Sequence, residues 1–308
     1  MNAVVRPGPQ IERDRWGRPL VMLGDGSGKK VSYKRCTTYI DVLDDRYQLE
    51  LWKQRQVADG LARRPDLVLK AAAAAGDKDE LNEVIKLAME AAGSATAATT
   101  GSALHSLTEQ VDRGAAPIIP PGSAADIDAY RTATAHLKMR LIEVFVVHDE
   151  LRVGGTFDRV VELDGVLYVA DIKTGSIDYA GSKIAMQLAL YSRSQLYDIR
   201  SGKRSELGVD QRRGLVIHLP AGSGECTLHW CDLDAGWEGV QLARQVWDWR
   251  ARKGLLKASQ PAPPTIIEMI GKCSDVQALR ALWAAYKTDW NDDLTAAAKA
   301  HIAALQKV

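Results

Sequence analysis

Two apolar segments joined by Asp164-Gly165 constrain the fold more than any other feature of this sequence. An Asp-Gly pair between β-forming segments is a strong signal for a hairpin with a two-residue turn. The flanking segments, 155–163 and 166–173, are rich in Val, Leu and Tyr, and both of their faces carry apolar residues. Strands that are apolar on both faces are typical of a sheet covered on both sides. The sequence therefore predicts a buried central hairpin.

A two-residue turn also determines which residues of the hairpin face each other. Leu163 then pairs with Val166, and counting outward places Asp158 opposite Asp171, with Cβ atoms about 4.5–5.5 Å apart. Two buried carboxylates at that distance repel each other unless one is protonated or a cation lies between them. Lys173 follows Asp171 by two residues and projects from the same face. The alternative is a surface hairpin in which Asp171 and Lys173 form an exposed ion pair.

Two carboxylates and a lysine in one patch suit metal-dependent hydrolysis of phosphodiester bonds. Mg²⁺ prefers hard oxygen ligands and keeps several waters, and a bound divalent cation polarises a phosphate and lowers the pKa of an attacking water. The ammonium of Lys173 would position that water or stabilise the transition state, whereas a deprotonated Lys173 would act as its base.

Two predicted helices carry further candidates. His105 and Glu109 lie at i, i+4 on the flank of one helix, where His105 is a candidate metal ligand through its imidazole. The alternative for His105 is a histidine that is merely packed or solvated. Gln187 and Tyr191 share one side of a second helix in the same way and, taken alone, are ordinary half-buried polar residues.

The remaining pattern predicts an α/β chain in which three antiparallel strands are followed by a helix and two more strands. We expect an N-terminal arm and helical region over 1–94, a core over 95–232 and a C-terminal helical region over 233–308, with a proline break at 261–264. Strands are expected at 18–23, 31–33, 141–153, 155–163, 166–173, 214–219 and 225–232, and helices within 44–90 and at 102–111, 182–199, 235–252, 276–286 and 293–306.

Taken in order, these residues resemble the PD-(D/E)XK nuclease superfamily in its RecB-like branch, which includes CRISPR-associated RecB-like exonucleases and many bacteriophage proteins. The signature of that branch is a helical histidine, then G-x-x-D, D/E-x-K and Q-x-x-x-Y. The proline in the superfamily's name is missing from this chain, because Phe157 precedes Asp158. The resemblance covers about residues 95–232 and is carried by His105, Gly155-Thr156-Phe157-Asp158, Asp171-Ile172-Lys173 and Gln187-Leu188-Ala189-Leu190-Tyr191.

The resemblance implies a restriction-endonuclease-like α/β core, with a mixed central sheet flanked by helices and with helical additions at both ends. It also implies a role for each residue of the signature. His105, Asp158 and Asp171 would bind Mg²⁺ or Mn²⁺ with the Ile172 carbonyl as a further ligand, Lys173 would be the catalytic lysine, and Gln187 and Tyr191 would orient that lysine or contact the DNA backbone.

The cysteines raise the question of a second cofactor. Several RecB-like nucleases hold an iron–sulfur cluster with four cysteines, and Cys36, Cys226, Cys231 and Cys273 match that count. Their spacing does not match, because no pair is close enough for a C-x-x-C site and Cys273 lies far beyond the others. We therefore expect reduced, mostly buried thiols and no cluster.

Net charge and hydropathy limit the kinds of partner that the chain can have. Forty basic and 39 acidic residues leave a net charge of +1 over 308 residues, which argues against a basic coat but leaves room for a local basic groove. No segment is long and apolar enough to span a membrane, and the first residues do not form a signal peptide, so we expect a cytoplasmic protein. Candidate phosphate contacts, each with a solvated charged patch as the alternative, are Lys29-Lys30, Arg63-Arg64, Lys203-Arg204 and Arg212-Arg213.

These observations lead to the expectation of a metal-dependent deoxyribonuclease, foremost an exonuclease of recombination, repair or phage DNA processing. A structure-selective endonuclease and a catalytically silent DNA-binding module on the same fold are the alternatives. DNA is the expected partner, and the helical ends leave room for a homo-oligomer contact or a recombination partner protein.

Overall fold

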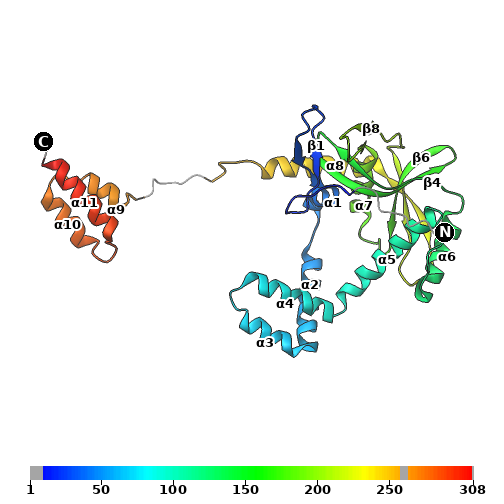
Figure 1. Ribbon diagram of the computed structural model, residues 1–308, viewed down its shortest axis with the longest axis horizontal. Helices are drawn as coiled ribbons and strands as arrows, with labels where there is room; N and C mark the ends of the chain where they lie inside the picture. The colour runs from blue at the N-terminus through cyan, green and yellow to red at the C-terminus, as the bar shows by residue number, and fades with distance from the viewer. Residues whose placement is uncertain (1–9, 257–262, 307–308) are drawn as a thin grey trace. The chain divides into compact units, whose positions relative to one another are not determined.

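The structure is a computed structural model that describes residues 10–256 and 263–306. It divides into two compact units, residues 1–251 and 252–308. The first unit holds a mixed β-sheet with helices and all of the predicted site residues (Figure 1).

The central sheet has eight strands among the described residues, and its main path runs β10-β9-β6-β5-β4-β7-β8, with β3 pairing with β5 outside that path. Strands β4, β5 and β6 are consecutive and antiparallel, as predicted, whereas β9 runs parallel to β6. The sheet is therefore mixed. Its strands are β3 (Lys34–Arg35), β4 (Lys138–His148), β5 (Val153–Leu163), β6 (Val166–Lys173), β7 (Gln195–Tyr197), β8 (Arg204–Glu206), β9 (Arg213–His218) and β10 (Thr227–Asp232).

The predicted hairpin and its register are confirmed. Asp164 and Gly165 both have positive φ angles, 51° and 80°, as a two-residue turn of type I′ requires. Leu163 pairs with Val166, and the ladder continues in the expected register to Arg159 and Ala170. Pairing between β5 and β6 ends at these two residues, so the expected pair of Asp158 and Asp171 lies one position beyond the ladder.

Apolar side chains of the hairpin pack on both faces of the sheet. Val160 and Val169 contact the cluster formed with α7 (Gly181–Ser192) and α8 (Leu233–Arg250). Their neighbours Val161 and Tyr168 point the other way and pack with Tyr130 of α6 (Ala124–Thr134), because successive strand residues alternate between faces. The hairpin is thus a covered, central element.

One predicted helix is shorter than expected. The segment 182–199 was expected to be helical throughout, but α7 ends at Ser192 and β7 begins at Gln195. Leu196 pairs with Val146 of β4, and the Tyr197 ring packs edge-on against Phe145 at 5.9 Å. Tertiary pairing with an exposed strand edge has overridden the local helical pattern here.

The N-terminal part of the first unit supplies a hairpin and five helices, among the residues that the structure describes. The hairpin β1 (Leu20–Met22) and β2 (Lys30–Ser32) was predicted. Three of the helices pack around Leu67, Val84 and Ala88, and the last of the five is the helix expected to carry His105. The helices are α1 (Cys36–Ile40), α2 (Tyr47–Arg63), α3 (Pro65–Ala73), α4 (Lys78–Ala91) and α5 (Ser94–Asp112).

The C-terminal boundary differs from the one drawn at residue 233. Helix α8 packs against α7 and belongs to the first unit, which extends to Ala251. Of the expected proline break, Pro261 and Ala262 lie outside the described residues. The second unit contains α9 (Ile266–Gly271), α10 (Val276–Ala285) and α11 (Asp292–Leu305), which pack around Ile270, Leu279 and Leu294.

Helix α9 was not predicted, and it is short. A capping box defines its start, in which Thr265 accepts from the backbone of Glu268 and Glu268 accepts from the backbone of Thr265. Across the described ranges of both units, no helix has the length and apolar character needed to cross a membrane.

Candidate active site

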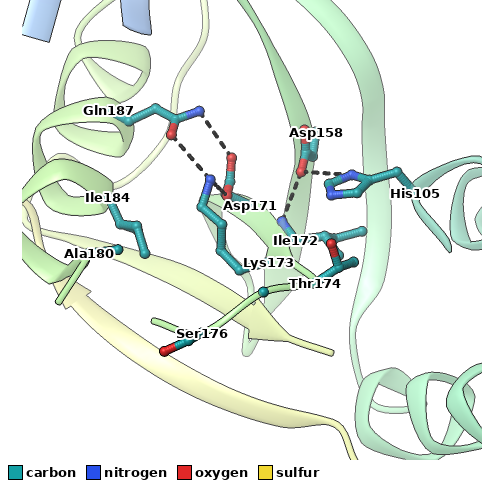
Figure 2. Close-up of a pocket in the computed structure, with 11 residues that line it drawn as sticks. His105, Asp158, Asp171, Ile172, Lys173, Thr174, Ser176, Ala180, Ile184 and Gln187 are labelled. Carbon is teal, nitrogen blue, oxygen red and sulfur yellow. Dashed lines mark hydrogen bonds and ion pairs between the residues drawn. The ribbon is translucent and has the colours of Figure 1, made fainter. Parts of the chain in front are cut away.

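A cavity of about 320 Å³ opens where the β5–β6 hairpin, α5 and α7 meet. Figure 2 shows the side chains that line it, and most of the predicted site residues are among them. The lining residues are His105, Asp158, Asp171, Ile172, Lys173, Thr174, Gly175, Ser176, Ala180, Ile184 and Gln187.

Both predicted carboxylates face this cavity and both are buried enough to be perturbed. Asp171 is 3% exposed, and burial raises its pKa to about 6, with nearby Asp158 adding to the rise and Lys173 opposing it. Burial also raises the pKa of Asp158, against the lowering effects of the Ile172 N–H and of Lys173. The Ile172 N–H donates to Asp158 Oδ2 at 2.8 Å, so the aspartate takes a backbone hydrogen bond where strand pairing has stopped.

Lys173 and Gln187 complete the surroundings of Asp171. The Lys173 ammonium lies 2.6 Å from Asp171 Oδ2, in an orientation that leaves this buried oxygen without a well-directed hydrogen bond. Gln187 bridges the pair, because its Nε2 donates to Asp171 Oδ1 at 3.2 Å and its Oε1 accepts from Lys173 at 3.3 Å (Figure 2). The alternative of an exposed surface ion pair is wrong, since the carboxylate is buried.

His105 reaches the cavity from α5. Its Nδ1 lies 3.6 Å from Asp158 Oδ2, which is beyond hydrogen-bond distance. Burial lowers the pKa of His105, and nearby Asp171 opposes that shift. The neutral imidazole that burial favours is the form in which histidine binds metals.

The approach of α5 to the site depends on a residue without a side chain. A Cβ atom at Gly101 would lie 2.7 Å from Thr174 Oγ1, directly after strand β6. His105 follows Gly101 by one helical turn. The close contact at Gly101 therefore brings the histidine to the edge of the cavity.

Tyr191 is not part of the cavity wall. It is 3% exposed and packs over Gly155, where a Cβ atom would lie 2.8 Å from the tyrosine ring and 3.1 Å from Cys36 Cβ. Burial raises the pKa of Tyr191 well above its usual value. A buried ring cannot contact a DNA backbone. A hydrogen bond with Gln187 opposes the rise in the pKa of Tyr191, so the other predicted role, orientation of Lys173 through Gln187, stays a prediction.

The donor set fits a hard divalent cation in its chemistry. Two carboxylates with raised pKa values and a neutral imidazole line one cavity, and Mg²⁺ and Mn²⁺ take such oxygen and imidazole ligands. The same donors do not form a ready-made cage, because no group of three or more His, Cys, Asp or Glu side chains in the described ranges is placed to hold a metal ion. The charge of Asp171 is instead balanced by an ion pair with the Lys173 ammonium.

Arg159 and Glu143 are residues beside the site that the sequence reasoning missed. Arg159 is 0% exposed, and its Nη1 donates to the backbone carbonyl of Asp158 at 2.8 Å. Glu143 of β4 lies 3.6 Å from Arg159 Nη1, and burial together with Asp158 raises the pKa of Glu143 to about 7. An arginine within the apolar run of β5 is itself a signal, because a buried guanidinium requires an acidic partner.

Several of the basic residues proposed as phosphate contacts are engaged in ion pairs. Lys30 lies 2.6 Å from Glu12, Arg63 lies 2.7 Å from Asp59, and Arg64 lies 2.7 Å from Asp66. Arg204 donates to Asp149 with two nitrogens at 3.0 Å. These pairs weaken the case for a preformed basic groove at those positions.

The four cysteines are free thiols. Cys36 is buried, and burial raises its pKa to about 12. Cys226, Cys231 and Cys273 are partly buried, and none of the four is disulfide-bonded, in keeping with the expected reduced, mostly buried thiols. Burial also raises the pKa values of Cys226 and Cys231 to about 11.

No protein-family model matches the chain, and no curated protein matches it. Among solved structures, that of SSO0001 aligns with 13% sequence identity and a TM-score of 0.26, over 77% of this chain and 94% of its own. A similarity this low supports no conclusion about fold family or activity.

Proposed function

We propose that the chain is a metal-dependent deoxyribonuclease with a restriction-endonuclease-like core, acting in the cytoplasm, or in the host cytoplasm if it is phage-encoded. One observation carries the proposal: Asp158 and Asp171, both with raised pKa values, share a cavity with Lys173, which Gln187 holds against Asp171. Carboxylates, a lysine and a histidine around one cavity are suited to hydrolysis of a phosphodiester bond.

In this proposal His105, Asp158 and Asp171 hold Mg²⁺ or Mn²⁺, with the Ile172 carbonyl as a further ligand. The cation, when bound, supplies Lewis-acid polarisation of the phosphate and a water of lowered pKa. The chain's own contribution is orientation: Gln187 bridges Lys173 and Asp171, so the ammonium remains at the cavity. From there Lys173 positions the attacking water and stabilises the charge that develops on the phosphate oxygens.

The cost of the site argues against a catalytically silent DNA-binding module. A carboxylate whose pKa is raised by burial destabilises the fold at neutral pH, and a module that only binds DNA gains nothing from two of them. Proteins keep such locally unfavourable arrangements where function requires them. An exonuclease of recombination, repair or phage DNA processing is the preferred form of the enzyme, and a structure-selective endonuclease is the second candidate.

A nuclease assay on linear and circular DNA tests this proposal. We expect purified protein with Mg²⁺ or Mn²⁺ to degrade linear DNA and to leave circular DNA intact, and we expect Asp171→Ala and Lys173→Ala to lose the activity. Lys138→Ala is the matched control, because Lys138 forms an exposed ion pair with Glu162 on the same sheet. Cleavage of circular DNA would select the endonuclease. Failure of the wild type to cut any DNA, or full activity in both site variants, would refute the assignment.

A further inference from the structure

Arg159, the residue after Asp158 on β5, forms a second buried polar cluster with Asp112 and Tyr130. Arg159 Nε and the Tyr130 hydroxyl each lie 2.6 Å from the same oxygen, Asp112 Oδ2. All three side chains are buried, with Arg159 and Asp112 only 1% and 5% exposed in their side chains. One carboxylate oxygen thus ties together β5, α5 and α6.

Each partner of the ion pair belongs to the same element as one proposed metal ligand. Asp112 follows His105 by seven residues on α5, which places the two on the same side of the helix two turns apart. Arg159 directly follows Asp158 on β5, and its Nη1 donates to the Asp158 carbonyl at 2.8 Å. The contact between Arg159 and Asp112 therefore links the helix that presents His105 to the strand that presents Asp158.

We infer that the ion pair of Arg159 and Asp112 is a positioning clamp that sets the separation of His105 from Asp158, and with it the affinity of the cavity for a divalent cation. The inference rests on the proposed function. His105 and Asp158 are not hydrogen-bonded to each other, since their closest atoms are 3.6 Å apart. Their relation must be maintained by the elements that carry them.

A purely structural role would be served as well or better by apolar residues. Replacing a buried ion pair by well-packed hydrophobic side chains is often neutral or stabilising, whereas removing one partner is strongly destabilising. The pair is also incompletely satisfied, because Arg159 Nη2 is buried without a hydrogen-bond partner in the described part of the chain. What apolar residues cannot reproduce is the directed bond from Arg159 to the Asp158 carbonyl.

The test replaces both partners together, Asp112→Leu with Arg159→Met, so that neither member of the pair is left buried without the other. A second, milder variant is Tyr130→Phe, which removes one hydrogen bond to Asp112. Two readouts that do not depend on activity are measured: Mn²⁺ affinity by electron paramagnetic resonance, and the NMR signal of the His105 ring in the metal-free protein. Glu162→Gln is the matched control, because Glu162 lies on β5 and pairs only with lysine and arginine at the surface of β4, as far as the described residues show.

We expect the double variant to remain folded by circular dichroism, to bind Mn²⁺ about ten- to a hundredfold more weakly, and to show a shifted or broadened His105 ring signal. Tyr130→Phe should change both readouts in the same direction and by less. In a His105→Ala background, the clamp variant should no longer weaken Mn²⁺ binding, because the group it positions is gone.

Unchanged Mn²⁺ affinity and an unchanged His105 signal in folded clamp variants would overturn the inference while leaving the proposed nuclease intact. A loss of affinity that persists in full in the His105→Ala background would also overturn it. If wild-type protein neither binds Mn²⁺ nor cuts DNA, the proposed function fails, and the His105 signal alone then decides whether the clamp positions that ring.

Discussion

Asp158 and Arg159 are adjacent in the sequence but belong to two charge clusters of opposite character. Asp158 faces an open cavity where buried carboxylates have raised pKa values. Arg159 faces a closed cluster in which Asp112 neutralises it at 2.6 Å. Burial of the carboxylates in the open cluster lowers the stability of the fold and makes those groups available for reaction. The closed cluster instead holds β5, α5 and α6 together. The comparison teaches that buried charge in one strand can serve reactivity at one residue and architecture at the next.

The sharpest way to break this comparison is to make the same substitution in each cluster. Asp171→Asn should lower kcat for DNA cleavage by on the order of 10³-fold, while stability is kept or raised because a buried negative charge is removed. Asp112→Asn should leave most of kcat at saturating Mg²⁺ but lower the free energy of unfolding. Steady-state cleavage rates and urea unfolding of both variants measure this. Equal losses of activity in the two variants would show that the two clusters do not differ in function.

Truncation of the guanidinium tests how much the closed cluster contributes to stability. Arg159→Ala leaves Asp112 buried without its charged partner, with only the Tyr130 hydroxyl still donating to it, so we expect the free energy of unfolding to fall by about 3–5 kcal/mol. Denaturant titration followed by circular dichroism gives the value. A loss below about 1 kcal/mol, the range of exposed pairs, would show that the cluster is not an architectural attachment. Arg131→Ala, at an exposed pair with Asp128, is the control.

The bridge between Lys173 and Asp171 should have a smaller, purely kinetic effect. Gln187→Ala removes two long hydrogen bonds, 3.2 Å to Asp171 and 3.3 Å to Lys173, so the lysine is less well positioned and we expect kcat to fall by about ten- to a hundredfold. Stability should change little, because both charges still face each other. Gln195→Ala, at an exposed strand position, controls for loss of a glutamine. An unaltered kcat would mean that Lys173 keeps its position without the hydrogen bond to Gln187.

The smallest effect expected concerns pH. In metal-free protein Asp171 has a pKa of about 6, above its value of about 4 in an unfolded chain. Between those values the folded protein retains a proton that the unfolded chain has released, so stability should fall as pH rises from about 4 to about 6. Asp171→Asn should flatten this slope in urea titrations with a chelator present. Parallel curves for the two proteins would contradict the raised pKa.

The hairpin was predictable because its determinants are local. The turn residues Asp164 and Gly165 and the two-residue loop set the register, and the register brought Asp158 and Asp171 together without knowledge of the rest of the chain. Helical spacing singled out His105 as a candidate ligand, the resemblance gave Gln187 its role, and both lie at the same cavity. The local sequence pattern was therefore enough to predict which side chains lie on the same face of a strand or helix.

Features that depend on distant partners were not predictable in the same way. The end of α7 and the start of β7 follow from the free edge of β4, which lies far away in the sequence. Helical spacing put Gln187 and Tyr191 on one side, yet it could not say that one would line a cavity and the other a core. Asp112 carries no motif, and its importance appears only once Arg159 is seen to need a partner.

The turn at Asp164-Gly165 has a consequence for the order in which the site is built. A hairpin with a short loop closes at little entropic cost and forms early, whereas docking a helix from a distant part of the chain is slower. The two carboxylates would therefore meet while the histidine is still elsewhere, and α5 would join them only when the tertiary fold is complete. A partly synthesised or partly unfolded chain would hold its two acids together without the histidine beside them.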